Sequence, residues 1–147
     1  MPIKRPKLQI KKLSQNATIP TRAEGTPAGL DLYALVPLRI AGKGVKLINT
    51  GLAMAIEEGY FIQIEERSGV SVKTSLSKKA GIIDSDYRGE VKIVMQNISD
   101  VFVDIEAGEK IAQFIVHRHY DPVVEVVETF DQEETERGDN GFGASGS

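Results

Sequence analysis

Two carboxylates, a phenol and a guanidinium lie close together at 84–88, within the stretch AGIIDSDYRGEVKIVMQN (80–97). Asp84 directly follows two β-branched apolar residues, and Tyr87 comes three positions later. A carboxylate that enters a partly dry pocket can act as a general base, and an aromatic ring beside it can pack on a ring of a ligand. The alternative is a solvated turn with a surface ion pair, which is the usual role of charged turns.

The segment that positions this cluster is predicted to be a β-hairpin. An apolar approach precedes Asp84, and Val91, Ile93 and Met95 alternate with their neighbours after Gly89. This pattern is typical of two strands joined by a turn. We therefore predict a hairpin over 80–97 whose tip carries the titratable cluster.

A second candidate site lies at ERSGVS (66–71), which interrupts the strand pattern. It predicts the chain's one short helix, with Ser68 as the N-cap and an end near Ser75 or Leu76. Free amides at a helix start beside Arg67 can bind an anion. The alternative is a helix cap with an incidental arginine.

The C-terminal stretch RGDNGFGASGS (137–147) is rich in glycine and carries one cation and one aromatic residue. Glycine permits close backbone approach, so a flexible arm could wrap phosphates with amides and Arg137 while Phe142 stacks on a base. The alternative is a disordered tail.

Composition limits the possible functions. A chain of 147 residues is most naturally one domain with a single core. The formal net charge of −3 gives no indication of a nucleic-acid or membrane partner, and the absence of cysteine excludes thiolate catalysis and metal sites built on sulfur. No apolar run approaches the ~20 residues of a membrane span, so we expect a cytoplasmic protein.

Short apolar and β-branched runs separated by turn residues predict an all-β fold, a sandwich or a jelly-roll barrel. In the run AGLDLYA (28–34), Asp31 lies on the face opposite the leucines and is expected to be exposed. The predicted strands outside the 80–97 hairpin are 8–10, 28–34, 36–40, 45–49, 52–56, 60–65, 101–105, 110–116 and 123–127.

Five stretches in order resemble the five motifs of the trimeric dUTPase family. They are AGLDLYA (28–34), ERSGVS (66–71), GIIDSDYRGE (81–90), GEKIAQFIV (108–116) and RGDNGFGASG (137–146). The resemblance implies a distorted jelly-roll β-barrel with one short helix, assembled as a homotrimer whose active sites are each built from three subunits. It divides the chain into a barrel domain over 1–136 and a flexible arm over 137–147 that closes the site.

The same resemblance implies hydrolysis of dUTP to dUMP and pyrophosphate. Asp84 matches the general base that deprotonates the water attacking the α-phosphorus in line. Tyr87 matches the residue that packs under the deoxyribose, where a ribose 2′-hydroxyl would collide. The backbone around Ala80, Gly81 and Ile82 matches the part that hydrogen-bonds the uracil edge, too close to admit a 5-methyl group.

Further matches concern the phosphates and the metal ion. Asp31 matches the acid that helps to hold Mg²⁺ through its water ligands, which suits an ion bound mainly to substrate oxygens. Phosphate contacts are implied for Arg67, Ser68, Gly69 and Gln113. Residues of the closing arm are implied to be Arg137, Gly141, Phe142, Gly143 and Ser145.

The chain departs from the family pattern at four places. Glu66 stands where proline or glycine is usual, and an extra acid beside a triphosphate should weaken binding unless it points away. Val70-Ser71 replaces a common Leu-Ala, Asn140 a frequent glycine, and Ala144-Ser145 a hydroxyl pair. None of these changes removes a residue with a chemical role.

Three other functions fit part of the pattern. A dCTP deaminase shares the fold in the wider superfamily, but the spacing of Asp84 and Tyr87 argues against it. A nucleotide-binding regulatory protein with little turnover should have lost catalytic groups, which are present here. A purely structural trimer gives no reason for an arm that bears Arg137 and Phe142.

Overall fold

The computed structural model describes residues 2–143. Its elements are ten strands and one short helix, all between Leu8 and Arg118. In chain order they are β1 (Leu8–Lys12), β2 (Leu30–Tyr33), β3 (Leu38–Ile40), β4 (Val45–Ile56), β5 (Tyr60–Glu65), α1 (Ser68–Lys73), β6 (Leu76–Lys79), β7 (Ile82–Ile83), β8 (Glu90–Asn97), β9 (Val103–Ile105) and β10 (Lys110–Arg118).

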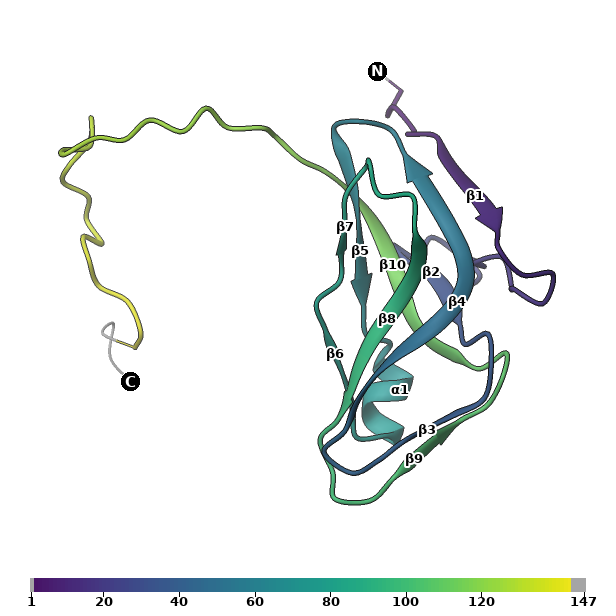
Figure 1. Ribbon diagram of the computed structural model, residues 1–147. Coiled ribbons are helices and arrows are strands. Elements are labelled where there is room, and N and C mark those ends of the chain that lie inside the picture. Colours follow the sequence, from purple (N-terminus) through teal and green to yellow (C-terminus); the bar gives the residue numbers. More distant parts are fainter. Residues whose placement is uncertain (1, 144–147) are drawn as a thin grey trace.

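Two four-stranded sheets face each other and enclose the core (Figure 1). The strand order is β1-β4-β8-β6 in the first sheet and β2-β10-β5-β7 in the second, and β3 and β9 form a separate pair. Every pairing is antiparallel. This arrangement confirms the prediction of an all-β jelly-roll barrel with one short helix.

The period-two pattern of the central strands builds the core. Val91, Ile93 and Met95 on β8 face Ile64 and other apolar side chains of the second sheet, and all four are at most 2% exposed. Successive residues of a strand point to opposite faces, so the alternating pattern puts one face of each sheet inside. Burial of these side chains is the main source of the barrel's stability.

One long strand, β4, replaces the two strands predicted at 45–49 and 52–56. Its register against β8 shifts between Asn49 and Ala53, and Gly51 at the shift has a φ of +71°. The Thr50 hydroxyl donates a hydrogen bond to Val91 O at 2.6 Å. The chain therefore bends at a bulge and stays in the sheet, because the side chain of Thr50 bridges to the neighbouring strand.

The predicted hairpin over 80–97 is wrong. The two-residue strand β7 pairs with β5 in the second sheet, whereas β8 pairs with β4 and β6 in the first. Ala80 and Gly81 have φ values of +55° and +133°. These positive φ values redirect the chain after β6 toward the other sheet, so 84–89 is a connection between sheets rather than a hairpin tip.

The strand predicted at 123–127 is also wrong, and β6 was missed. Residues 119–143 contain no strand and extend away from the barrel (Figure 1). Val123 and Val126 are 96% and 95% exposed, so the single chain offers them no sheet partner. The polar sequence of β6, LSKK, lacks the apolar alternation of a strand.

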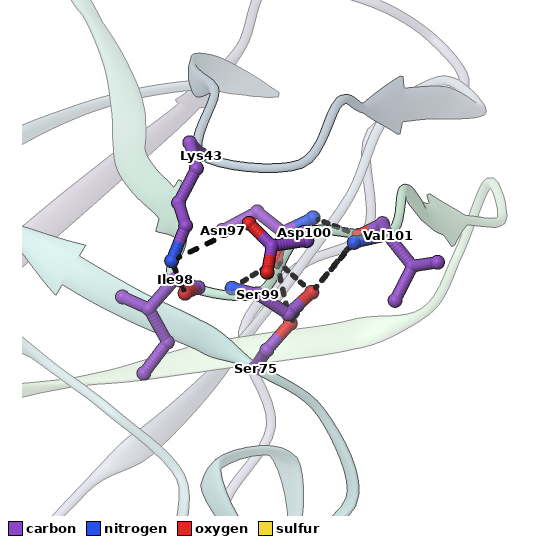
Figure 2. A network of polar contacts seen from close by, with 7 residues as sticks. All are labelled: Lys43, Ser75, Asn97, Ile98, Ser99, Asp100 and Val101. Carbon is purple, nitrogen blue, oxygen red and sulfur yellow. Dashed lines mark hydrogen bonds and ion pairs between the residues drawn. The ribbon is translucent and has the colours of Figure 1, made fainter.

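A buried amide joins β8 to three other parts of the barrel (Figure 2). Asn97 is 0% exposed; its Nδ2 donates to Val101 O at 2.6 Å and to Ile40 O at 3.2 Å. Its Oδ1 accepts from the hydroxyls of Ser75 and Ser99, at 2.6 and 2.9 Å. Both ends of the amide are therefore satisfied, and the residues after α1 are anchored to the end of β8.

Within residues 2–143, the one helix is too short and too polar to cross a membrane.

Candidate active site

Five of the predicted substrate-binding and catalytic residues line a single pocket, which we call the Asp84 pocket. It lies where β6, β7 and the connection to β8 meet. The predicted residues among its lining are Ala80, Gly81, Ile82, Asp84 and Tyr87, and the others are Leu47, Ile64, Lys79, Ile83, Glu90, Val91, Lys92 and Val94. The redirected chain thus still gathers these residues, although its topology differs from the one expected.

Tyr87 is fixed by the connection that carries it. Its hydroxyl donates a hydrogen bond to Glu90 O at 2.9 Å, and its backbone N–H donates to Asp84 O at 3.2 Å. The ring lies against Gly89, where a Cβ atom would collide with it. The glycine of the motif is therefore required by the position of the tyrosine ring.

The backbone of Ala80 and Gly81 is held at the wall of the pocket. Gly81 O accepts a hydrogen bond from Ile64 N at 2.8 Å, which anchors the turn to β5. A Cβ atom on Gly81 would approach Ile64 O to 2.9 Å. This close approach, together with the φ of +133°, restricts the position to glycine.

Asp84 is exposed in the single chain, which differs from the partly dry environment expected. Its side chain lies between two hollows, since Asp84 also lines a second pocket with Asp86, Arg88 and His119. The Arg88 guanidinium donates a hydrogen bond to Ser85 O at 2.6 Å, so its side chain folds back onto the segment between β7 and β8. One barrel therefore leaves Asp84 open to solvent.

A second group of predicted residues, which we call the Arg67 cluster, consists of Asp31, Arg67 and Gln113. The strand order β2-β10-β5 brings three distant motifs side by side, with Gln113 paired to Asp31 on one side and to Glu65 on the other. Arg67 comes two residues after the end of β5, and its Nε lies 2.9 Å from Asp31 Oδ1.

Asp31 is 7% exposed, so the expectation of an exposed strand residue is wrong. Lys110 Nζ lies 3.6 Å from its second carboxylate oxygen. The two cations explain the burial, because a carboxylate inside a protein needs charged or hydrogen-bonding partners. The residue faces outward from the leucines as predicted, but Arg67 and Lys110 cover it.

A lone carboxylate fits a role in holding a metal ion through its water ligands. Within residues 2–143, no three His, Cys, Asp or Glu side chains are grouped as they would be to bind an ion directly. Mg²⁺ keeps several waters and is usually bound by one or two carboxylates and by substrate phosphates. Asp31 offers one such carboxylate, and because Arg67 and Lys110 lie against its two oxygens, it would reach an ion through water.

The helix that follows Arg67 begins differently from the prediction. Its N-cap is Arg67 rather than Ser68, and Arg67 makes no side-chain cap hydrogen bond. Ser68 and Gly69 form the first turn and are exposed. The Gln113 side chain donates from Nε2 to Glu66 O at 2.9 Å, which secures the chain just before the helix.

The predicted arm lies apart from both groups in the single chain (Figure 1). Arg137 Nε donates to Asn140 O at 2.8 Å and closes a small turn, and Phe142 is fully exposed. Phe142 and Gly143 have φ values of +51° and +84°. Ser145, the last predicted arm residue, lies outside the described residues.

The described residues therefore form three separate groups. Asp31, Arg67 and Gln113 are absent from the residues that line the Asp84 pocket, and the arm extends away from the barrel. One chain presents the three groups at different places.

The sequence as a whole matches known proteins along nearly all of its length. A profile of the dUTPase family matches residues 15–146. The chain is 44% identical to the probable deoxyuridine 5′-triphosphate nucleotidohydrolase of Schizosaccharomyces pombe, covering 93% of this chain and 96% of that protein. It is 45% identical to the corresponding protein of Yarrowia lipolytica, covering 95% and 88%. The chain belongs to the dUTPase family.

Solved structures of the dUTPase family have the same fold. The G164S mutant of the dUTPase of Staphylococcus bacteriophage 80alpha, determined with dUpNHpp, superposes with a TM-score of 0.90 at 32% identity, and the match covers 96% of this chain and 99% of the phage chain. The barrel strands end at Arg118. A match over 96% of the chain therefore extends into the arm. A phage phi11 dUTPase mutant, described as coordinating a structural Mg(II) ion, superposes with a TM-score of 0.79 at 29% identity, covering 85% and 99%.

Sequence reasoning missed three residues that support the Arg67 cluster. Lys110 approaches Asp31, and a Cβ atom at Gly29 would collide with the Gln113 side chain. Glu66 accepts hydrogen bonds from three neighbours. Gly29 and Lys110 could have been found from the sequence, because each lies inside one of the family motifs. Glu66 was noted only as a departure from the family pattern.

Proposed function

We propose that this protein hydrolyses dUTP to dUMP and pyrophosphate, with Asp84 as the general base. The observation that carries the proposal is the gathering of Ala80, Gly81, Ile82, Asp84 and Tyr87 around one pocket. This set includes a fixed backbone edge, an aromatic ring and a carboxylate. A uracil, a deoxyribose and a water molecule are their respective partners in the proposal.

Recognition of the base uses the backbone of 80–82, which is held against β5 by the Ile64 N to Gly81 O hydrogen bond. Backbone donors and acceptors suit the hydrogen-bonding edge of uracil, and a close backbone rejects a 5-methyl group by collision. The Tyr87 ring, held by Glu90 O, packs under the sugar. A ribose would bring its 2′-hydroxyl against that ring.

The reaction needs a positioned water and a base. Asp84 removes a proton from the water molecule while the oxygen of that water attacks the α-phosphorus in line. The bond between the α-phosphorus and the bridging oxygen to the β-phosphorus breaks, and pyrophosphate leaves with the electron pair. Proton abstraction by a positioned base contributes roughly a hundredfold to ten-thousandfold.

Phosphate binding is assigned to Arg67, Ser68, Gly69 and Gln113. Arginine suits this role because its planar guanidinium presents several donors to phosphate oxygens. Mg²⁺, held by substrate phosphates and by waters that Asp31 orients, would neutralise charge on the triphosphate. In the arm, Arg137 contacts the phosphates, Phe142 stacks on the base, and Gly141, Gly143 and Ser145 provide the close backbone approach.

The separation of the three groups in one chain supports a homotrimer with shared active sites. In this assembly the Asp84 pocket of one subunit faces the Arg67 cluster of the next, and an arm closes over both. The exposed valines of the extended segment at 123–127 then have a neighbouring subunit to pack on. The same closure removes water from Asp84, which one barrel leaves exposed.

Pyrophosphate release from dUTP, dTTP, dCTP and UTP, measured with Mg²⁺ and with a chelator, tests the proposal. We expect hydrolysis of dUTP only, and only with the metal. Rejection of dTTP tests the backbone edge, rejection of UTP tests Tyr87, and the chelator tests the metal. Bound dUTP without release would indicate a regulatory protein, and ammonia from dCTP would indicate a deaminase; either result contradicts the proposal.

A further inference from the structure

The carboxylate of Glu66 is an unexpected junction in the barrel. Oε1 accepts a hydrogen bond from the backbone N–H of Lys78 at 2.5 Å and from the Ser77 hydroxyl at 3.3 Å. Oε2 accepts from the Ser71 hydroxyl at 3.3 Å. Lys78 and Ser77 belong to β6, and Ser71 belongs to α1. One side chain therefore connects the start of the helix to a strand that follows it.

The backbone of Glu66 is held as well. Its carbonyl accepts from Gln113 Nε2 at 2.9 Å, and the next residue, Arg67, lies 2.9 Å from Asp31. Glu66 thus stands where β10, β6 and α1 meet. Of the barrel residues assigned to the phosphates, Arg67, Ser68 and Gly69 follow it in the chain, and Gln113 donates to its carbonyl.

The edge of the first sheet explains why a carboxylate fits here. β6 is the outermost strand of that sheet and has β8 on one side only. Its Lys78 N–H faces away from β8 and would lack a strand partner, and Glu66 supplies the acceptor. Hydrogen bonds to an ionised acceptor are stronger than neutral ones, so the contact holds the edge and the helix together.

The direction of the Glu66 side chain decides whether its negative charge would repel a triphosphate. Glu66 stands where proline or glycine is usual in the family, and an acid there was expected to repel a triphosphate unless it pointed away. Its oxygens are engaged by α1 and β6. Ser71, a second departure from the family pattern, is one of its partners. The two departures therefore form one contact.

We propose that Glu66 is a positioning residue, which fixes Arg67, Ser68 and Gly69 for the β- and γ-phosphates by tying α1 to β6. The inference rests on the proposed function, because it takes these residues as phosphate ligands. The network reaches the residues assigned to the base only through Lys78, whose ammonium donates to Ile64 O, while the N–H of Ile64 holds Gly81 O. Its loss should therefore weaken binding of the triphosphate more than binding of dUMP.

Three variants separate positioning from charge. Glu66→Ala removes the whole junction, and Ser71→Ala removes only the contact to α1. Glu66→Gln keeps the acceptor for Lys78 N and can donate to the Ser71 hydroxyl, so it keeps the geometry without the charge. Glu106→Ala is the control, because Glu106 is an exposed acid in the turn between β9 and β10.

The measurements are KM and kcat for dUTP, the dissociation constant of dUMP, and the melting temperature of each variant. We expect Glu66→Ala to raise KM for dUTP about tenfold, the scale of one charged hydrogen bond. Ser71→Ala should give a smaller rise in the same direction, and Glu66→Gln should restore KM to near the wild-type value. Glu106→Ala should match wild type.

Each other outcome is decisive. A lower KM in both Glu66→Ala and Glu66→Gln would mean that the charge repels substrate, and the inference would be wrong. If binding of dUTP and of dUMP weakens equally and the melting temperature falls, Glu66 stabilises the fold and does not position the phosphate ligands. If Glu66→Ala does not fold, an unchanged KM in Ser71→Ala overturns the proposal. Wild-type protein that does not hydrolyse dUTP would instead refute the proposed function.

Discussion

Arg67 Nε and Asp31 Oδ1 lie 2.9 Å apart, and the carboxylate is nearly buried beneath the guanidinium. A buried carboxylate is costly without a partner, so Arg67 is held in this orientation before any ligand arrives. The residue proposed to bind phosphate is therefore oriented by the residue proposed to reach the metal ion. Such preorganisation lowers the entropic cost of binding a flexible triphosphate.

Replacement of the proposed base tests the chemistry most directly. Asp84→Asn should keep dUTP binding and lower kcat by roughly two orders of magnitude or more, because the amide cannot accept the proton from water. Pyrophosphate release gives kcat, and calorimetry gives dUTP affinity. Asp86→Asn is the matched control, since Asp86 lines the second pocket only, and it should behave like wild type. Turnover at the wild-type rate in Asp84→Asn would exclude Asp84 as the base.

Removal of residues 137–147 tests the arm. The shortened chain should fold and assemble as the full chain does, because the barrel strands end at Arg118, well before the cut. Its turnover should fall strongly, since water is then no longer excluded from the reacting phosphorus. Circular dichroism and sedimentation check fold and assembly, and pyrophosphate release checks the rate. An unchanged rate would make the arm a plain tail.

Sedimentation velocity tests the shared site. We expect three times the mass of one chain at micromolar concentration, because each chain alone presents the three groups apart. Measurement with and without dUMP distinguishes a permanent trimer from one that the ligand assembles. A monomer that hydrolyses dUTP at the same concentration would contradict the shared-site proposal.

Asn97 should be among the most sensitive polar positions of the barrel. Asn97→Ala removes the amide donor of Ile40 O and one of the two side-chain partners of Val101 O and of the Ser75 hydroxyl, which keep their contacts to Ser99. An unsatisfied buried group costs about 1–3 kcal/mol, so we expect a loss in this range. Urea unfolding at a fixed protein concentration measures the loss. Asn16→Ala, at an exposed asparagine, should change stability little.

Acid should weaken the contact between β3 and β9. The Arg39 guanidinium donates from Nε and Nη2 to Asp104 at 2.7 and 3.0 Å and, chiefly through hydrogen bonding, holds the pKa of Asp104 below its usual value. The ionised form is favoured in the folded state, so its contribution is present above the unfolded pKa of about 4 and is lost as pH falls through the lower folded pKa.

The variant Asp104→Asn removes this contribution at every pH. We therefore expect the difference in melting temperature between wild type and Asp104→Asn to shrink as pH falls below about 4. The difference should be small, because both partners are exposed. If the difference in melting temperature grows on acidification, the contribution of the Arg39–Asp104 pair to stability depends on pH in the opposite direction.

Local patterns predicted the fold class well. Alternation marked the central strands, since one face of each is buried and the other is not. The same patterns could not identify the partner of the two-residue β7, which pairs with β5 in the second sheet and not with β8. Nothing in the local sequence distinguishes a hairpin tip at Asp84 from a connection between sheets, because both use the same turn residues.

The parts of the candidate site that lie within one sequence motif were predictable, and the parts that depend on tertiary contacts were not. Ala80, Asp84 and Tyr87 lie close in sequence, so their common pocket follows from one motif. The burial of Asp31 depends on Arg67 at the N-cap of α1 and on Lys110 in β10, which are distant in the sequence. Strand parity gives the direction of a side chain but not what covers it.

In the proposed trimer, the long exposed segment after β10 has a consequence for a newly made chain that has not yet assembled. Val123, Val124 and Val126 are 82% to 96% exposed there. Apolar segments of this kind are what chaperones and proteases recognise in incomplete proteins. The lifetime of the chain in a cell would then depend on how quickly it meets its partners, and surplus single chains would be removed first.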